Sequence, residues 1–418
     1  MVRSTRRGTA VNEISAEQFA KLLGPDFQNA IRRGVCDYLS EIGLAVMQAL
    51  MQGEVDYWCG KKFSRKSDDQ PVRWGKQKGV VQVRDAKESV QRPRLRARNG
   101  EGEIDLETYA AFSNGRVLSD RTLAVIGAGV PIRQYESLVS KDLRKHGVSS
   151  SAVSRRVVAE SQRALESFLA RRWDKAKFVT LLFDGVRIGK AMVVACVGID
   201  KSGTKYVLGW KLGSTENETV CRDLIRQLID AGLNKEADYL FVVDGAKALS
   251  AAIKAAFGSS VSIQRCQEHK IRDVESYLPV KLRKVFRDKL HAAFNERTYK
   301  RASDRLQRVR SQLLTISEPA ANSLTEGLEQ TLTLHKLDIH GGVRESLRTT
   351  NIIESAFSSL RRHTRNVTAW GDSDQVNRWL ATGLAKAEKS FRRVPGYRQI
   401  AKLQRKLTEH SALQTANK

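Results

Sequence analysis

A short apolar run that ends in an acid and a glycine constrains the fold of this chain more than any other feature. The run is Tyr239–Val243, and Asp244 and Gly245 follow it directly. Five consecutive apolar or aromatic residues are too few for a separate helix and are typical of a strand buried on both faces. Asp244 would then lie at the carboxyl end of the strand, where open α/β sheets bind their ligands.

An earlier segment repeats this pattern. The run Phe178–Phe183 is followed by Asp184 and Gly185. Two central strands that each end in Asp-Gly would place two carboxylates at one edge of a sheet. Because Asp-Gly after a strand is also typical of a simple turn, both interpretations stay open from these residues alone.

The segment around these two runs alternates between strand and helix patterns. Further strands are expected at residues 192–199, 205–212 and 261–265, and the loop at 200–204 predicts a hairpin between the first two. Amphipathic helices are expected at residues 218–231 and 247–257. The order β-β-β-α-β-α-β predicts a mixed sheet with helices on its faces, and residues 279–339 predict a basic helical segment after it.

The net charge of the chain favours a polyanionic partner. The 418 residues include 72 Lys and Arg against 46 Asp and Glu, which gives a formal net charge of +26. Such a charge is most often associated with nucleic-acid binding, and the alternative is an enzyme with a solvated basic surface. No stretch approaches the roughly 20 apolar residues of a membrane span, and the N-terminus lacks the apolar region of a signal peptide. Five widely spaced cysteines favour a reduced, cytoplasmic location over a disulfide framework.

Two basic segments of the N-terminal third are candidates for DNA contacts. The first is an expected strand at residues 90–96, which would place Arg92, Arg94 and Arg96 on one side. This row would follow a phosphate backbone, or else it guards the edge of a sheet.

The second basic segment lies at residues 135–159, which predict a helix-turn-helix-like hairpin. Its second helix carries Ser154, Arg155 and Arg156, short polar and basic side chains that suit a DNA groove. Ordinary helical hairpins share this pattern, so that alternative stays open as well.

A third acid is needed if Asp184 and Asp244 belong to a site for two metal ions. Glu354 is the candidate, because three arginines for phosphate binding follow it on an expected helix: Arg361, Arg362 and Arg365. The alternative is a capping box, with Asn351 as N-cap and Glu354 at the third helical position. Spacing alone favours the capping box.

Cysteine and histidine occur together once at ligand-like spacing, as Cys266 and His269. Two ligands do not make a structural zinc site, which needs four, so a packed cysteine and a hydrogen-bonded histidine are the simpler interpretation. The chain has no phosphate-binding P-loop, no dinucleotide fingerprint and no nucleophile elbow, which removes those three enzyme classes.

Several motifs taken together resemble the Mutator-type transposases of bacterial insertion sequences. These motifs are Leu182–Arg187, Leu208–Glu216, Val242–Lys247, Ile263–Arg272, Arg348–Ser355 and Leu360–Arg362, with Pro93–Arg96 and Gly147–Ser149 as further family features. The similarity extends from about residue 80 to residue 395. One departure is Gln267-Glu268, where family members often have an aromatic residue between the cysteine and the histidine.

The resemblance implies an α/β RNase H-like catalytic domain, a mixed sheet flanked by helices, with an all-α insertion and a mostly helical N-terminal DNA-binding region. The implied boundaries are 1–60, 61–104, 105–173, 174–278, 279–345, 346–390 and 391–418, with the insertion at 279–345. Asp184, Asp244 and Glu354 become the implied catalytic residues and the ligands of two Mg²⁺ or Mn²⁺ ions. This overrules the capping box, and it makes Cys266 and His269 a signature near the site.

The implied function is a DNA transposase that cleaves and joins strands by a DDE mechanism, named after its three acids. Its partners would be double-stranded DNA, both the terminal inverted repeats and the target, and a second copy of the chain. The expected location is the bacterial cytoplasm, in association with the nucleoid and without a membrane. Further DNA contacts are expected at Arg265, Lys270, Arg348, Asn351, Arg361, Arg362 and Arg365. The alternatives are a metal-dependent nuclease or resolvase on the same fold, and a non-catalytic DNA-binding protein derived from a transposase.

Overall fold

The structure, a computed structural model, divides into two compact units. It describes residues 44–60, 71–83, 86–97, 102–113, 123, 126–128, 150–215 and 217–416. The first unit comprises Met1–Thr122 and Tyr135–Val153, and the second comprises Leu123–Gln134 and Ser154–Lys418. The expected helix-turn-helix hairpin falls largely outside the described residues, apart from α6 (Ser150–Leu169), which contains the expected second helix.

The described part of the first unit is a small antiparallel sheet covered by helices. The sheet has the order β1 (Val72–Val83), β2 (Ala86–Arg96) and β3 (Glu103–Ile104). A helix over residues 44–59 and the short α3 (Glu107–Ser113) pack against it. The carboxylate of Glu54 accepts hydrogen bonds from the first backbone N–H groups of α3, which ties the two helices together.

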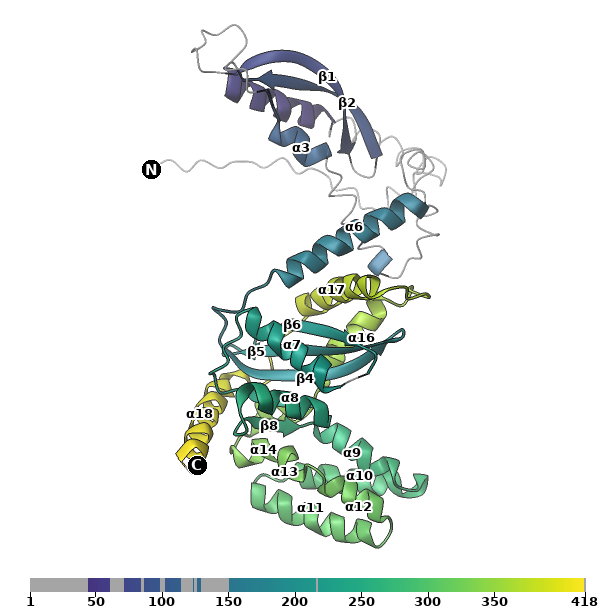
Figure 1. Cartoon of the computed structure of the whole chain (residues 1–418), viewed down its shortest axis with the longest axis vertical. Coiled ribbons are helices and arrows are strands. Elements are labelled where there is room, and N and C mark those ends of the chain that lie inside the picture. Colours follow the sequence, from purple (N-terminus) through teal and green to yellow (C-terminus); the bar gives the residue numbers. More distant parts are fainter. Residues whose placement is uncertain are drawn as a thin grey trace, which may run out of the picture. The chain divides into compact units, whose positions relative to one another are not determined.

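The described part of the second unit is built around a five-stranded mixed sheet (Figure 1). Its strands are β4 (Phe178–Ile188), β5 (Ala191–Asp200), β6 (Lys205–Gly213), β7 (Leu240–Val243) and β8 (Ser262–Arg265). The spatial order is β6-β5-β4-β7-β8. β4, β5 and β6 pair antiparallel, whereas β7 and β8 join them in parallel. The predicted order of strands and helices along the chain, the mixed sheet and the predicted hairpin loop are therefore confirmed.

One prediction about β4 is wrong. The apolar run was expected to end at Asp184, but the strand continues to Ile188 because its antiparallel pairing with β5 continues through Gly185 and Arg187. Only the parallel pairing with β7 stops early, at Leu182. The Asp184-Gly185 pair is therefore part of a strand and not a turn.

One face of this sheet is covered by α7 (Glu218–Asp230) and α8 (Lys247–Phe257). α7 begins at the N-cap Asn217, whose side chain accepts a hydrogen bond from the Val220 N–H. Its apolar stripe packs with Phe183 of β4 in one hydrophobic cluster. The predicted amphipathic helices are confirmed.

The opposite face is covered by helices from the last quarter of the chain (Figure 1). These helices are α15 (Gly341–Leu347), α16 (Asn351–His363), α17 (Ser373–Lys389) and α18 (Ile400–Ala416), with the short η2 (Tyr397–Gln399) before α18. Phe357 of α16 packs with Val186 of β4. Because Asp184 alternates with Leu182 and Val186 along the strand, it lies on this same face.

The segment after β8 is entirely helical and has its own core. It contains α9 (Gln267–Ser276), α10 (Val280–Phe294), α11 (Tyr299–Leu314), α12 (Glu318–Thr325), α13 (Leu328–Thr331) and α14 (Thr333–Lys336). Gln264 of the edge strand β8 donates from its side chain to Thr331 O and accepts from Leu334 N–H. Thr333 of α14 also donates its hydroxyl to Ile263 O at 2.6 Å, which covers the open edge of β8. None of the helices in the described ranges is long and apolar enough to cross a membrane.

Candidate active site

Two acids meet where the pairing of β4 and β7 ends. The parallel register pairs Thr180 with Leu240 and Leu182 with Val242. Continuing that register by two residues places Asp184 beside Asp244, on the same face of the sheet. Asp184 is 5% exposed, and Asp244 follows directly after β7. Asp244 Oδ1 accepts the Ala246 N–H at 2.9 Å, which closes the turn into α8.

The third acid comes from α16, which packs on that face. α16 begins at Asn351, and its N-cap is Thr350, with no side-chain capping hydrogen bond. The capping-box alternative for Asn351 and Glu354 is therefore wrong. Glu354 lies instead 3.6 Å from His269 Nε2 and 3.7 Å from Arg272 Nη1, so α9 holds its carboxylate.

The β4–β7 register and the position of Glu354 beside His269 bring these side chains together, and their charges act on one another. The pKa of Asp184 is raised to about 7, mainly by burial and also by the charges of Asp244 and Glu354, whereas His269 and the Gly185 N–H oppose the increase. A hydrogen bond to Cys266 raises the pKa of His269 to about 9, assisted by the charges of Asp184 and Asp244. The three acids and His269 therefore form one electrostatic cluster, which we call the carboxylate edge (Asp184, Asp244, Glu354 and His269).

The Cys266–His269 pair connects α9 to the start of α16. Thr350 donates its backbone N–H to Cys266 Sγ at 3.4 Å and its hydroxyl to the same sulfur at 3.6 Å. The Thr350 hydroxyl also lies 3.4 Å from His269 Nδ1. Cys266 and Thr350 are fully buried. The pair thus fixes the N-cap of α16, the helix that carries Glu354. The sequence spacing of Cys266 and His269 did not reveal this role.

The donor chemistry of the carboxylate edge fits a divalent cation. Three carboxylates are the oxygen ligands that Mg²⁺ prefers, and a cation would offset both the burial of Asp184 and its repulsion by Asp244 and Glu354, which together raise its pKa. Within the part of the chain that the structure describes, no three His, Cys, Asp or Glu side chains are close enough to hold one ion. The acids are therefore gathered but not arranged as a finished coordination shell.

The expected DNA contacts on and before α16 fall into two groups. Arg361, Arg362 and Arg365 are exposed on or just after α16, and Asn351 is exposed at its start. Arg348 is occupied, because it pairs with Glu345 at 2.7 Å and donates to Asn295. Arg361 and Arg362 lie on the same helix as Glu354, whereas Arg365 follows its end and donates to Ala128 O at 3.3 Å.

Arg265 and Lys270 differ from the expectation. Both were expected to contact DNA, yet their side chains are 8% and 0% exposed, respectively. Each is engaged with the loop around Glu326. In this conformation neither side chain is accessible to a phosphate.

In the first unit, the arginine row of β2 is largely paired. Arg94 forms a two-pronged ion pair with Glu103, with its shortest contact at 2.6 Å, and Arg92 reaches the same carboxylate at 3.3 Å. Arg96 lies over the ring of Trp74, 4.8 Å from its centroid.

On α6 of the second unit, Arg155 is exposed, whereas Ser154 and Arg156 are half-buried. Arg155 is thus the most accessible of the three residues that were expected to enter a DNA groove.

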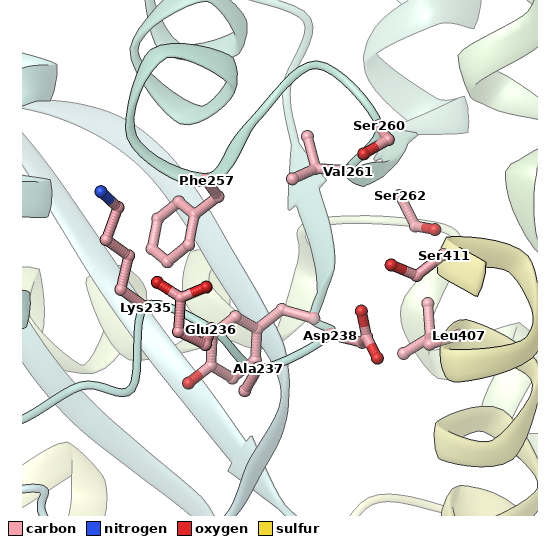
Figure 2. A pocket seen from close by; sticks show the side chains of 11 residues that line it. Lys235, Glu236, Ala237, Asp238, Phe257, Ser260, Val261, Ser262, Leu407 and Ser411 are labelled. Atoms are coloured by element: carbon pink, nitrogen blue, oxygen red, sulfur yellow. The ribbon is translucent and has the colours of Figure 1, made fainter. Parts of the chain in front are cut away.

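A cavity of about 160 Å³ lies at the other ends of the central strands (Figure 2). Its lining includes Asp238 and Tyr239 before β7, Ser260 and Val261 before β8, and Ser411 of α18. β7 and β8 begin there and end at the carboxylate edge. The cavity is therefore separate from the candidate site.

The fold and the carboxylate edge define a class: an α/β protein that gathers several acids at one edge of a mixed sheet. A comparison with known families makes this specific. The family described as "Transposase, Mutator family" matches residues 17–394. The chain belongs to the Mutator family of transposases, as its motifs predicted.

Individual relatives carry transposase names as well. The chain is 24% identical over 378 residues to the transposase for insertion sequence element IS256 in transposon Tn4001 of Staphylococcus aureus, which covers 87% of this chain and 93% of that protein. It is 25% identical over 354 residues to the ISRM5 transposase of Rhizobium meliloti, covering 82% and 85%. Over 226 residues it is 30% identical to the IS406 transposase of Burkholderia multivorans, covering 53% and 54%.

Proposed function

We propose that this transposase binds the ends of an insertion sequence and cleaves and joins DNA strands by a DDE mechanism, with Asp184, Asp244 and Glu354 as its catalytic acids. The supporting observation is geometric: the continued β4–β7 register pairs Asp184 with Asp244, and α16 packs on the same face of the sheet with Glu354 3.6 Å from His269 Nε2. In this proposal the mixed sheet is an RNase H-like catalytic domain, and the helices after β8 are an insertion in it.

The three acids would hold two Mg²⁺ or Mn²⁺ ions. When bound, such ions polarise a phosphodiester, make the attacking water more acidic and stabilise the leaving oxygen. The protein's own part is to hold the acids in place. His269 and Arg272 keep Glu354 near the sheet, while the exposed Arg361 and Arg362 on the same helix would bind the DNA phosphates.

The reaction needs no covalent link between enzyme and DNA. Water attacks a phosphodiester at the element's end, the phosphorus–oxygen bond to the 3′ oxygen breaks, and that oxygen leaves as a hydroxyl after taking up a proton. The freed 3′-OH then attacks a phosphodiester of the target strand and loses its proton. The phosphorus–oxygen bond in line with this attack breaks, and the target strand's 3′ oxygen leaves and takes up a proton. Because two ends must be processed together, we expect a homodimer.

Three conservative substitutions test this function: Asp184→Asn, Asp244→Asn and Glu354→Gln. Each should lower Mg²⁺-dependent nicking of DNA that contains an element end by about 10³-fold, because each removes an anionic ligand of the metal ions that would stabilise the transition state. Binding to the same DNA should stay within a few-fold of wild type. Asp304→Asn, on the exposed side of α11, is the matched control and should leave nicking unchanged.

A strand-transfer assay separates the proposed function from the nuclease alternative. Wild-type protein should join a pre-cut end to target DNA, whereas a nuclease would nick and never join. Undiminished nicking in any of the three acid variants would exclude that acid from the proposed mechanism. A wild-type protein that binds but never nicks with Mg²⁺ or Mn²⁺ would favour the non-catalytic alternative.

A further inference from the structure

Arg265, the last residue of β8, is buried between two glycine turns. Its guanidinium lies against Gly245 and Gly327, and a methyl group at either position would overlap it. Both glycines have positive φ angles, 118° and 64°, which other residues adopt rarely. Two chain segments that are 82 positions apart therefore close on one side chain.

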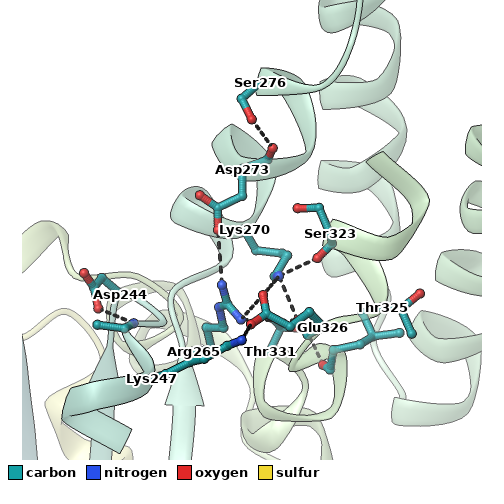
Figure 3. A network of polar contacts seen from close by, with 12 residues as sticks. Asp244, Lys247, Arg265, Lys270, Asp273, Ser276, Ser323, Thr325, Glu326 and Thr331 are labelled. Atoms are coloured by element: carbon teal, nitrogen blue, oxygen red, sulfur yellow. Dashed lines mark hydrogen bonds and ion pairs between the residues drawn. The ribbon is translucent and has the colours of Figure 1, made fainter. Parts of the chain in front are cut away.

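Polar contacts fix this guanidinium from the side of the helical segment (Figure 3). Arg265 Nη1 donates to Glu326 O at 3.2 Å and lies 3.3 Å from Glu326 Oε2, while Nη2 lies 3.2 Å from Asp273 Oδ2. Lys270 Nζ, fully buried, donates to Ser323 O at 2.6 Å and to Glu326 O at 2.7 Å. We call these four charged residues the Arg265 latch (Arg265, Lys270, Asp273 and Glu326).

The backbone connects the Arg265 latch to Asp244 of the carboxylate edge. Arg265 pairs with Val243 in the β7–β8 ladder, and Gly245 directly follows Asp244. Among the described residues, Arg265 Nε has no hydrogen-bond acceptor, and the atoms of this group pack on Gly245. Because Nε makes no hydrogen bond, the position of the guanidinium depends on the bonds of its other two nitrogens to Glu326 and Asp273 and on its packing against Gly245.

We propose that Arg265 is a positioning residue for Asp244, and that the loop carrying Glu326 sets the position of Arg265. The helical segment after β8 then controls the geometry of the carboxylate edge and does more than cover the edge of β8. This inference rests on the proposed function, in which Asp244 is a metal ligand. It also replaces the expected DNA contact of Arg265, since the guanidinium is enclosed.

The test compares Arg265→Met with Arg344→Met in the full-length protein. Arg344 is also buried and also donates to backbone carbonyls, those of Phe294 and Glu296, but it does not touch Gly245. The direct readout is hydrogen exchange of the Ala246 amide, which is bonded to Asp244 Oδ1. Arg265→Met should speed this exchange by about tenfold or more, because a contact to a charged group is lost beside it. Arg344→Met should not.

Nicking and binding assays complete the test. Arg265→Met should lower the nicking rate by about tenfold or more, because small misplacements of a catalytic group have effects of this size or larger. Its affinity for end DNA should stay within a few-fold of wild type. If Arg265→Met does not fold, Arg265→Lys and Glu326→Gln give the same readouts, and both should show smaller increases in Ala246 exchange.

Three outcomes would overturn the inference. The first is unchanged Ala246 exchange in Arg265→Met, or in both milder variants if that protein does not fold. The second is an equal increase in Arg344→Met, which would indicate a general loss of stability. The third is a large loss of DNA affinity with unchanged exchange, which would make Arg265 a DNA contact after all. Because amide exchange needs no nicking activity, the inference can fail or succeed independently of the proposed function.

Discussion

Replacing Thr350 by valine tests whether the Cys266–His269 pair positions Glu354. Valine keeps the shape of threonine and the backbone N–H that bonds to Cys266, but it removes the hydroxyl. That hydroxyl lies 3.6 Å from Cys266 Sγ and 3.4 Å from His269 Nδ1. The substitution therefore releases one side of the His269 ring, whose other nitrogen lies 3.6 Å from Glu354.

The expected effects on stability and activity differ in size. Both lost contacts are long, so together they should lower the free energy of unfolding by only about 1 kcal/mol, or about 2–4 °C in melting temperature for a unit of this size. Nicking should fall by about 10- to 100-fold, because a freed His269 no longer fixes the Glu354 carboxylate. Thermal unfolding and nicking of end-containing DNA measure the two effects.

Two further variants make this result interpretable. Thr350→Ser keeps the hydroxyl and should stay close to wild type in nicking. Thr382→Val removes a buried hydroxyl that also contacts a histidine, His363 at 3.2 Å, but away from the acids. It should lower stability by a similar amount and leave nicking unchanged. Equal losses of nicking in Thr350→Val and Thr382→Val would refute a positioning role for Thr350.

Three other predictions follow from buried or paired charges. Burial lowers the pKa of His335 and His363 to about 4, so the unfolded chain binds protons first as pH falls below about 6.5. The free energy of unfolding should therefore fall between about pH 6.5 and 4, by at most about 3 kcal/mol per histidine. His363→Gln should make this fall shallower when it is measured by urea unfolding, and an unchanged pH dependence would contradict the prediction. Glu103→Gln should free Arg94 to bind a DNA phosphate. The slope of the logarithm of DNA affinity against the logarithm of salt concentration should then steepen by about 0.9, and an unchanged slope would show that Arg94 does not bind DNA. Glu388 accepts from Arg171 and from the Val207 N–H, so Glu388→Gln should lower the free energy of unfolding by about 1–3 kcal/mol, and an unaltered melting temperature would contradict this.

The sheet was predictable because its strands are nearly continuous apolar runs. Residues 178–183 and 240–243 are buried on both faces, so composition alone marked them as central strands. The continuation of β4 beyond Asp184 was not predictable from composition, since Gly185 and Arg187 interrupt the run. Pairing with β5 holds these residues in the strand, and pairing partners are not visible in a local sequence pattern.

The site was predictable in part. Asp184 and Asp244 stood out because each follows a buried run, and Glu354 was selected through family resemblance against its local capping pattern. The burial of Lys270 was missed because lysine is almost always exposed unless it is paired. Its partners are the carbonyls of Ser323 and Glu326, more than 50 positions further along the chain. A local pattern cannot identify partners that the fold brings together from so far away.

The most direct test of the central claim is a crystal structure of the protein soaked with Mn²⁺, read from the anomalous scattering of the metal. We expect metal density at the carboxylate edge, within bonding distance of Asp184 and Asp244, with Glu354 turned toward it, and no such density in Asp184→Asn. Density at other sites with none at this edge, or a Glu354 carboxylate that points away from the metal, would contradict it.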